Sequence, residues 1–146
     1  MADGRPTRGL APLVPELDVQ DLNASLDFWC GVLGFRIAYQ RPENGFAFLE
    51  REGAQVMLKR YNGNWQVARL ERPFGRGINF EIKVASLEPI LAALSARGWP
   101  LFRPPEERWY RIGAEEGGNR QFLVQDPDGY LLRFAEDLGS RPVTAG

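Results

Sequence analysis

The feature that most constrains the fold is a weak internal repeat with an offset of 65 residues. Residues 16–19 (ELDV) and 81–84 (EIKV) both alternate polar and apolar side chains, as half-buried strands do (81 − 16 = 65). Leu22 recurs as Leu87 at the same offset, just after each strand. The repeat therefore predicts two similar modules, each beginning with a strand followed by a helix.

The helix expected in each module is marked by an apolar stripe and by end signals. The first is expected over residues 22–33, with Asp21 as N-cap and Gly34 as its C-terminal stop. The second is expected over residues 87–96 and is followed by Gly98 and Pro100, which end helices.

Short apolar runs separated by turn residues predict strands after each helix. The expected strands cover residues 35–41, 46–50 and 55–61 in the first module, and 101–103, 109–112, 121–125 and 130–135 in the second. The expected organisation is one domain at 10–138, with modules at about 10–61 and 77–138, a linker at 62–76 and terminal segments at 1–9 and 139–146. The tail from Ser140 is expected to be loose.

Composition limits the classes of function. The net charge is −1, which gives no reason to expect nucleic acid as a partner. The N-terminus lacks the apolar region of a signal peptide, and the apolar runs are too short to span a bilayer, so we expect a cytoplasmic protein without a membrane partner. Cys30 is the single cysteine and cannot form an intrachain disulfide. The absence of histidine removes imidazole both as a general base and as a metal ligand.

The segment from Gln121 to Phe134 contains two apolar runs joined by Asp-Pro-Asp-Gly. Pro127 presets a turn, and Gly129 supplies the positive φ that follows it. This hairpin, with Leu33-Gly34-Phe35 and residues 77–80 (GINF), resembles the vicinal oxygen chelate proteins, the group of glyoxalases, bleomycin resistance proteins and extradiol dioxygenases. The resemblance implies an α+β fold of two βαβββ modules, which form a cupped mixed eight-stranded sheet with helices on its outer face.

The metal-binding members of that family take ligands from the first and last strand of each module. The matching places in this sequence are Val14, Leu58, Asn79 and Arg133. None is a usual ligand of a catalytic divalent ion, so we expect neither a metal nor another cofactor. Glu16 and Glu81 lie two positions beyond Val14 and Asn79 and stay open as an alternative carboxylate pair.

Without metal chemistry, the resemblance points to the bleomycin resistance branch, whose members bind the drug as homodimers. A flat, cationic ligand calls for aromatic faces and acidic groups. The candidate ligand-binding residues are Tyr39, Phe46, Phe48, Trp65, Trp109, Tyr110, Glu16, Glu81 and Arg133. Gly118 stands where relatives often carry a tryptophan, and Trp109 or Trp65 is a candidate substitute.

The function expected from the sequence is non-catalytic: a metal-free homodimer that sequesters bleomycin-type antibiotics and so gives antibiotic resistance. The alternative is a superfamily enzyme, such as a lyase or dioxygenase, that uses the Glu16 and Glu81 carboxylates. A third possibility is a binding module that senses a metabolite.

Overall fold

The computed structural model describes residues 4–143. These residues divide into two compact units. The first holds residues 4–76 together with Asp126–Tyr130, and the second holds Gly77–Gln125 and residues 131–143. Each unit contains a four-stranded mixed sheet and one α-helix, so the α+β class and the two βαβββ modules are confirmed. No helix within residues 4–143 is long and apolar enough to cross a membrane.

The first unit is built on a sheet with the strand order β1-β4-β3-β2. Its strands are β1 (Glu16–Val19), β2 (Arg36–Arg41), β3 (Phe46–Arg51) and β4 (Ala54–Arg60), with a short 3₁₀ helix, η1 (Pro42–Asn44), between β2 and β3. β1 runs parallel to β4, and the other neighbours are antiparallel.

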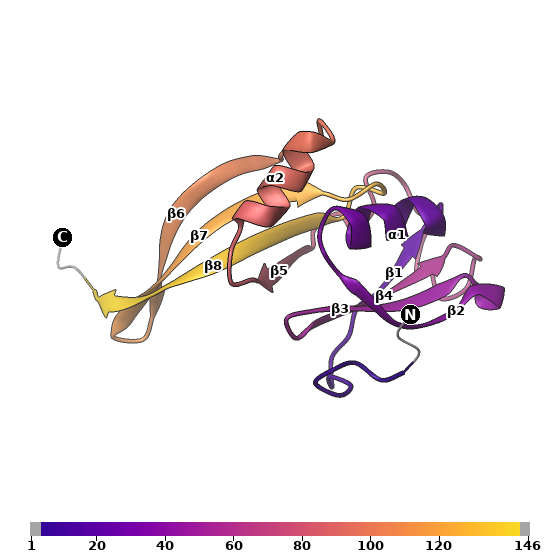
Figure 1. Cartoon of the computed structure of the whole chain (residues 1–146), viewed down its shortest axis with the longest axis horizontal. Helices are drawn as coiled ribbons and strands as arrows, with labels where there is room; N and C mark the ends of the chain where they lie inside the picture. The colour runs from indigo at the N-terminus through magenta and orange to yellow at the C-terminus, as the bar shows by residue number, and fades with distance from the viewer. Residues whose placement is uncertain (1–3, 144–146) are drawn as a thin grey trace. The chain divides into compact units, whose positions relative to one another are not determined.

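The helix of this unit, α1 (Leu22–Gly31), lies against one face of the sheet (Figure 1). The Asp21 side chain accepts a hydrogen bond from the Ala24 amide at 3.1 Å, so the predicted N-cap is confirmed. Trp29 on α1 is buried and packs edge-on against Phe35, with ring centroids 5.1 Å apart. The stop predicted at Gly34 has a φ of 78°, which glycine adopts without strain.

The opposite face of this sheet is called the open face below. Successive strand residues point to opposite faces, so Phe46 and Phe48 lie on the face away from Ala47 and Leu49. Phe46 and Phe48 form a small apolar cluster with Ala38, against which Val14, Tyr39 and Met57 pack.

Residues 4–11 are bonded to the strands of their own unit. The Thr7 amide donates to both carboxylate oxygens of Glu50 at 3.0 Å, and the Ala11 amide donates to Gln55 Oε1 at 2.9 Å. Desolvation alone would raise the pKa of Glu50, but the bonds from Thr7 and Arg36 outweigh it and lower that pKa. The N-terminal segment is therefore held by a buried carboxylate.

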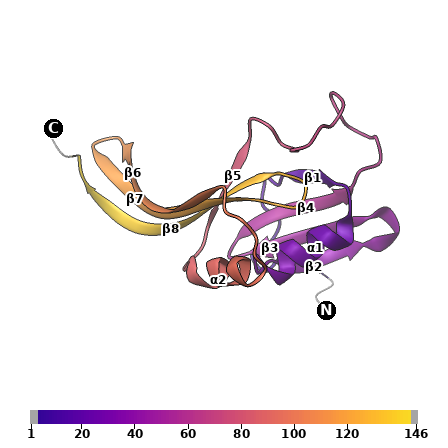
Figure 2. The same ribbon diagram turned by 90° about the horizontal axis from the view of Figure 1, so that it is seen from above.

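The second unit repeats this topology in the strand order β5-β8-β7-β6. Its strands are β5 (Asn79–Lys83), β6 (Arg103–Ile112), β7 (Glu115–Gln125) and β8 (Leu131–Pro142). Its helix, α2 (Glu88–Ala96), lies against one face of the sheet (Figure 1). Residues 61–78 form an extended loop without helix or strand (Figure 2).

The strands of the second module are longer than the sequence predicts. The strand predicted at 101–103 is wrong for residues 101 and 102, and Arg103 begins a single strand, β6, that includes the run 109–112. β6 pairs with β7 at the edge of the sheet, which is why it tolerates Pro104 and Pro105. The predicted start of β7 at Gln121 and the loose tail from Ser140 are both wrong. β7 begins at Glu115, and its pairing with Pro142 shows that the tail is strand as far as residue 142, whereas residues 144–146 of the predicted tail lie outside the described part of the chain.

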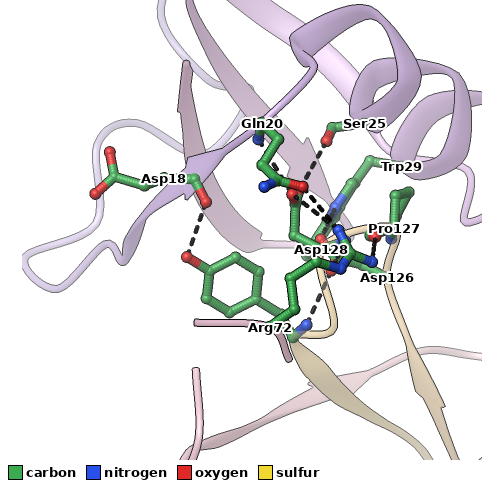
Figure 3. Close-up of polar contacts among 9 residues, drawn as sticks. Asp18, Gln20, Ser25, Trp29, Arg72, Asp126, Pro127 and Asp128 are labelled. Carbon is green, nitrogen blue, oxygen red and sulfur yellow. Dashed lines mark hydrogen bonds and ion pairs between the residues drawn. The ribbon is translucent and has the colours of Figure 1, made fainter. Parts of the chain in front are cut away.

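The Asp-Pro-Asp-Gly turn belongs by its contacts to the first unit (Figure 3). Asp126 Oδ2 accepts the indole N–H of Trp29 at 3.1 Å, and Asp128 accepts hydrogen bonds from the Gln20 amide and the Ser25 hydroxyl. Tyr130 donates its hydroxyl to the Asp18 carbonyl at 2.9 Å. The turn is therefore a buried part of that unit's framework.

Candidate functional site

Each unit has a surface pocket lined by strand residues. In the first unit the pocket measures about 470 Å³ and is lined by Glu16, Arg41, Phe46, Lys59, Arg60 and Trp65, among others. We call it the Trp65 pocket. In the second unit the pocket measures about 500 Å³. Glu81, Tyr110, Arg133 and Asp137 contribute to its lining, and we call it the Arg133 pocket.

Trp65 is the most exposed aromatic side chain of the Trp65 pocket, at 89%. Its φ of 59° is rare for a bulky residue. The Asn64 amide bonds to the Asn62 side chain at 3.0 Å and shapes the loop that presents Trp65. The Lys59 ammonium lies 5.1 Å from the centre of the indole ring. A large flat ring is thus held open to solvent by a strained backbone.

The wall of the Trp65 pocket continues into stacked aromatic rings. Phe46 lines the pocket, and Tyr39 stacks on Phe48 with ring centroids 5.0 Å apart. Arg41 lies over the Phe46 ring, with Cζ 4.0 Å from its centre. Phe48 is 2% exposed, so it supports the wall from behind and offers no free face.

Each pocket contains a carboxylate that is already paired with a cation of its own unit. In the first unit Lys59 lies 3.7 Å from Glu16 and 3.4 Å from Asp18. In the second unit Arg133 lies 3.7 Å from Glu81. The modules therefore share one arrangement, in which a basic residue of the last strand neutralises a carboxylate of the first strand.

The pairing of the strands shows that one of the four positions matched to the metal ligands of relatives was misassigned. Glu16 pairs with Met57 in β4, just as Glu81 pairs with Arg133 in β8. Met57 packs on the open-face cluster, whereas Leu58 is fully buried and points to the other face. The prediction that Leu58 occupies the ligand position was therefore off by one residue.

These residues do not fit a catalytic metal ion. Within residues 4–143, no three cysteine, aspartate or glutamate side chains gather in a group that could hold one. The cations Lys59 and Arg133 stand beside the carboxylates that would have to bind a metal, and a basic side chain repels a divalent ion.

Cys30 offers no activated nucleophile either. Burial raises the pKa of its thiol, which disfavours the reactive thiolate.

The structure brings together only part of the set of candidate binding residues. Glu16, Phe46 and Trp65 line one pocket, and Glu81, Tyr110 and Arg133 line the other. Tyr39 and Phe48 stack behind the first pocket. Trp109 lies outside the lining of the Arg133 pocket and is covered by Arg141, whose Cζ is 3.9 Å from the ring centre.

Trp109 and Gly118 are directly paired across β6 and β7. A Cβ atom at Gly118 would lie 2.6 Å from the indole ring of Trp109. The Trp109 ring thus fills the space that a side chain at position 118 would need. Its position is consistent with the idea that Trp109 stands in for the tryptophan that relatives often carry at the place of Gly118.

The sequence reasoning missed three basic residues of the Trp65 pocket: Arg41, Lys59 and Arg60. Two of them could have been found by strand alternation. Arg41 lies two positions after Tyr39 in β2, and Lys59 lies two positions after Met57 in β4. Residues two positions apart in a strand point to the same face, so Arg41 shares the face of Tyr39 and Lys59 shares that of Met57. Arg60 carries no such signal, because its place depends on the path of the η1–β3 turn.

The comparisons with known proteins agree with this architecture. Residues 13–134 match the model of the glyoxalase/bleomycin resistance protein/dioxygenase superfamily. TioX from Micromonospora sp. ML1 is 24% identical, with 88% of this chain and 99% of that one covered and a TM-score of 0.67.

Two further solved structures carry the superfamily name. The one from Alicyclobacillus acidocaldarius is 21% identical over 86% of this chain and 90% of its own, with a TM-score of 0.58. The one from Vibrio splendidus 12B01 is 38% identical over 84% of this chain and 95% of its own, with a TM-score of 0.39. A comparison with curated protein sequences found no match. With two βαβββ modules and a family match across most of its length, the chain belongs to the glyoxalase/bleomycin resistance protein/dioxygenase superfamily.

Proposed function

We propose that this protein is a non-catalytic binding protein for a flat aromatic small molecule, which it sequesters by stacking against Trp65. The observation that carries the proposal is the exposed Trp65 ring, held in a left-handed backbone conformation at a pocket of about 470 Å³. Backbone strain of this kind concentrates at functional sites. Stacking on an exposed aromatic face is an efficient way to hold a flat ligand.

A binding role is favoured over catalysis by the state of the polar groups. The name of the superfamily covers both dioxygenases and drug resistance proteins. The Glu16 and Glu81 carboxylates that an enzyme would need belong to different units and are paired with Lys59 and Arg133. Each carboxylate is thus already engaged by a cation of its own unit and is not held free to act on a ligand.

Bleomycin-type antibiotics are the first specific ligands to test, since the sequence resembles proteins that sequester them. Trp65 would contact the flat part of the drug, and Tyr110 of the Arg133 pocket is a second aromatic candidate. Protection by sequestration would be stoichiometric, with no more drug neutralised than protein supplied.

The test combines calorimetric titration with recovery of the ligand. We expect saturable binding of bleomycin or of a simpler flat aromatic probe, and mass spectrometry of the released ligand should find it unchanged. A product that accumulates beyond the molar amount of protein would overturn the binding role and favour the enzyme alternative. Failure of every aromatic probe to bind would reject the proposal as a whole.

The expected partner is a second copy of the chain. Large apolar side chains are exposed at the end of β6 and just beyond β8, with Ile112 exposed by 69% and Val143 by 39%. Exposed apolar groups at the end of a long hairpin favour association. Sedimentation equilibrium should find a dimer that Ile112→Asp weakens; a monomer at high concentration would reject this part of the proposal.

A further inference from the structure

We infer that the Trp65 pocket selects a ligand carrying a negatively charged group next to its aromatic ring. The inference rests on the proposed function and specifies the ligand class of the same site. It follows from two guanidinium groups, those of Arg41 and Arg60, that line the pocket and have no anionic partner among residues 4–143.

Arg41 packs against the aromatic wall of the pocket. Its Cζ lies 4.0 Å from the centre of the Phe46 ring and 5.7 Å from the centre of the Tyr39 ring. A guanidinium that stacks on a ring keeps its N–H groups available at its edge. Arg41 can therefore offer two parallel donors to a carboxylate, sulfonate or phosphate with little loss of side-chain freedom.

Arg60 reaches the pocket across a glycine. A Cβ atom at Gly45 would lie 2.9 Å from Cβ of Arg60 and 3.4 Å from its Nε and Cζ atoms. Gly45 has a φ of 62° and accepts the Arg60 amide N–H at its carbonyl at 2.8 Å. The absence of a side chain at position 45 thus lets Arg60 lie over the turn that follows η1. Because η1 begins directly after Arg41, this turn lies close to Arg41 in the sequence.

The charged side chains that line the pocket carry an excess of one positive charge, since Arg41, Lys59 and Arg60 are basic and only Glu16 and Glu43 are acidic. Lys59 pairs with Glu16 and also with Asp18, which lies outside the lining. Glu43 is an exposed lining carboxylate that has no ion pair within the described chain. Two unpaired guanidiniums thus face one unpaired carboxylate, and the pocket favours an anion over a cation.

The experiment uses three probes that share a naphthalene ring and differ in the charge of its substituent: 2-naphthoate, 2-naphthamide and 2-naphthylmethylammonium. Each is titrated by calorimetry into the full-length protein at neutral pH and low ionic strength. We expect 2-naphthoate to bind about tenfold tighter than the amide, because its carboxylate can accept charge-assisted hydrogen bonds from one or two guanidinium groups. The cationic probe should bind weakest, and added salt should reduce the preference for the anion.

Variants of the two arginines test whether they cause the preference for the anionic probe. Arg41→Gln and Arg60→Gln should each reduce the preference for naphthoate over naphthamide, whereas Arg60→Lys should retain part of it. Arg5→Gln makes the same change of charge at an exposed residue of the first unit outside the pocket lining, and it should behave as the wild type. Circular dichroism checks that each variant is folded.

The outcomes separate this inference from the proposed function. Equal binding of the three probes, or tightest binding of the ammonium probe, would overturn anion selection and leave aromatic binding in place. Tight binding of cationic bleomycin that survives both glutamine variants would overturn it as well. If neither the naphthalenes nor bleomycin bind, both conclusions fail.

Discussion

Trp29 donates its indole N–H to Asp126 Oδ2 at 3.1 Å, which joins two residues 97 positions apart in the sequence. Asp126 Oδ1 also accepts the amide N–H groups of Asp128 and Tyr130, both at 2.9 Å. This carboxyl group thus fixes the shape of the buried turn and anchors it to α1 (Figure 3). Burial raises the pKa of Asp126 to about 6, although the bond from Trp29 acts in the opposite direction.

The raised pKa predicts that the first unit loses stability as pH rises. The folded protein holds the Asp126 proton more tightly than the unfolded chain, with a pKa of about 6 instead of 3.8. The contribution is therefore fully present below about pH 4 and is lost as pH rises through about 6, which amounts to about 3 kcal/mol. Asp126→Asn should remove this pH dependence. The variant should also have a free energy of unfolding about 1 kcal/mol lower at low pH, because an amide N–H₂ in the place of Oδ2 cannot accept the hydrogen bond from Trp29.

Urea denaturation at about pH 4.5 and about pH 7.5 measures the effect. Glu43→Gln makes the same carboxylate-to-amide change at an exposed position and should follow the wild type. An Asp126→Asn variant that keeps the full wild-type pH dependence would contradict the role given to this carboxyl group.

Gly129 is predicted to be intolerant of any side chain. Its φ is 101°, and a Cβ atom there would lie 2.5 Å from Cβ of Pro73 and 2.7 Å from its Cα. Gly129→Ala should lower the free energy of unfolding by about 3 kcal/mol, from backbone strain and steric overlap together. Gly63→Ala is the matched control, with a φ of 84° and nothing within 4 Å of its Cβ, and it should cost about 1 kcal/mol. Equal losses in chemical denaturation would show that the contact with Pro73 does not matter.

The purified protein is predicted to hold no divalent metal ion tightly. Lys59 and Arg133 occupy the positions beside the carboxylates of β1 and β5, and their charges oppose a cation. Elemental analysis after dialysis should find far less than one ion per chain, and a chelator should leave the unfolding temperature unchanged. One tightly bound ion per chain would contradict both the pairing argument and the non-catalytic role.

Local chemistry made much of the fold predictable. The Asp21 cap, the end of the second helix before Gly98 and the positive φ of Gly129 follow from interactions within a few residues, and the structure contains all of them. The first helix ends at Gly31, earlier than the stop predicted at Gly34. The repeat correctly indicated two modules of the same topology. The errors lie where tertiary pairing overrides local preference: the diglycine Gly117-Gly118 reads as a loop, yet it lies within β7 because β6 and β8 pair with it on both sides.

The aromatic residues of the candidate site were the part that the sequence could indicate. Trp65 and Phe46 were identified from residue type and spacing, and the structure places both at one pocket. The direction of Leu58 was misjudged because a shift of one residue in a strand exchanges its faces. The paired states of Glu16 and Glu81 could not be foreseen, since their cations lie on strands far away in the sequence.

The measurement that tests the account most directly compares the binding of 2-naphthoate to the wild type, Trp65→Ala and Trp109→Ala. Trp65 is an exposed ring of the pocket, whereas Trp109 packs between Gly118 and Arg141 outside either pocket lining. The account predicts that Trp65→Ala weakens binding at least about fivefold, since stacking on an aromatic ring contributes about 1 kcal/mol beyond the area that it buries. Trp109→Ala should bind as the wild type does. Unchanged affinity of a folded Trp65→Ala variant would contradict the central claim.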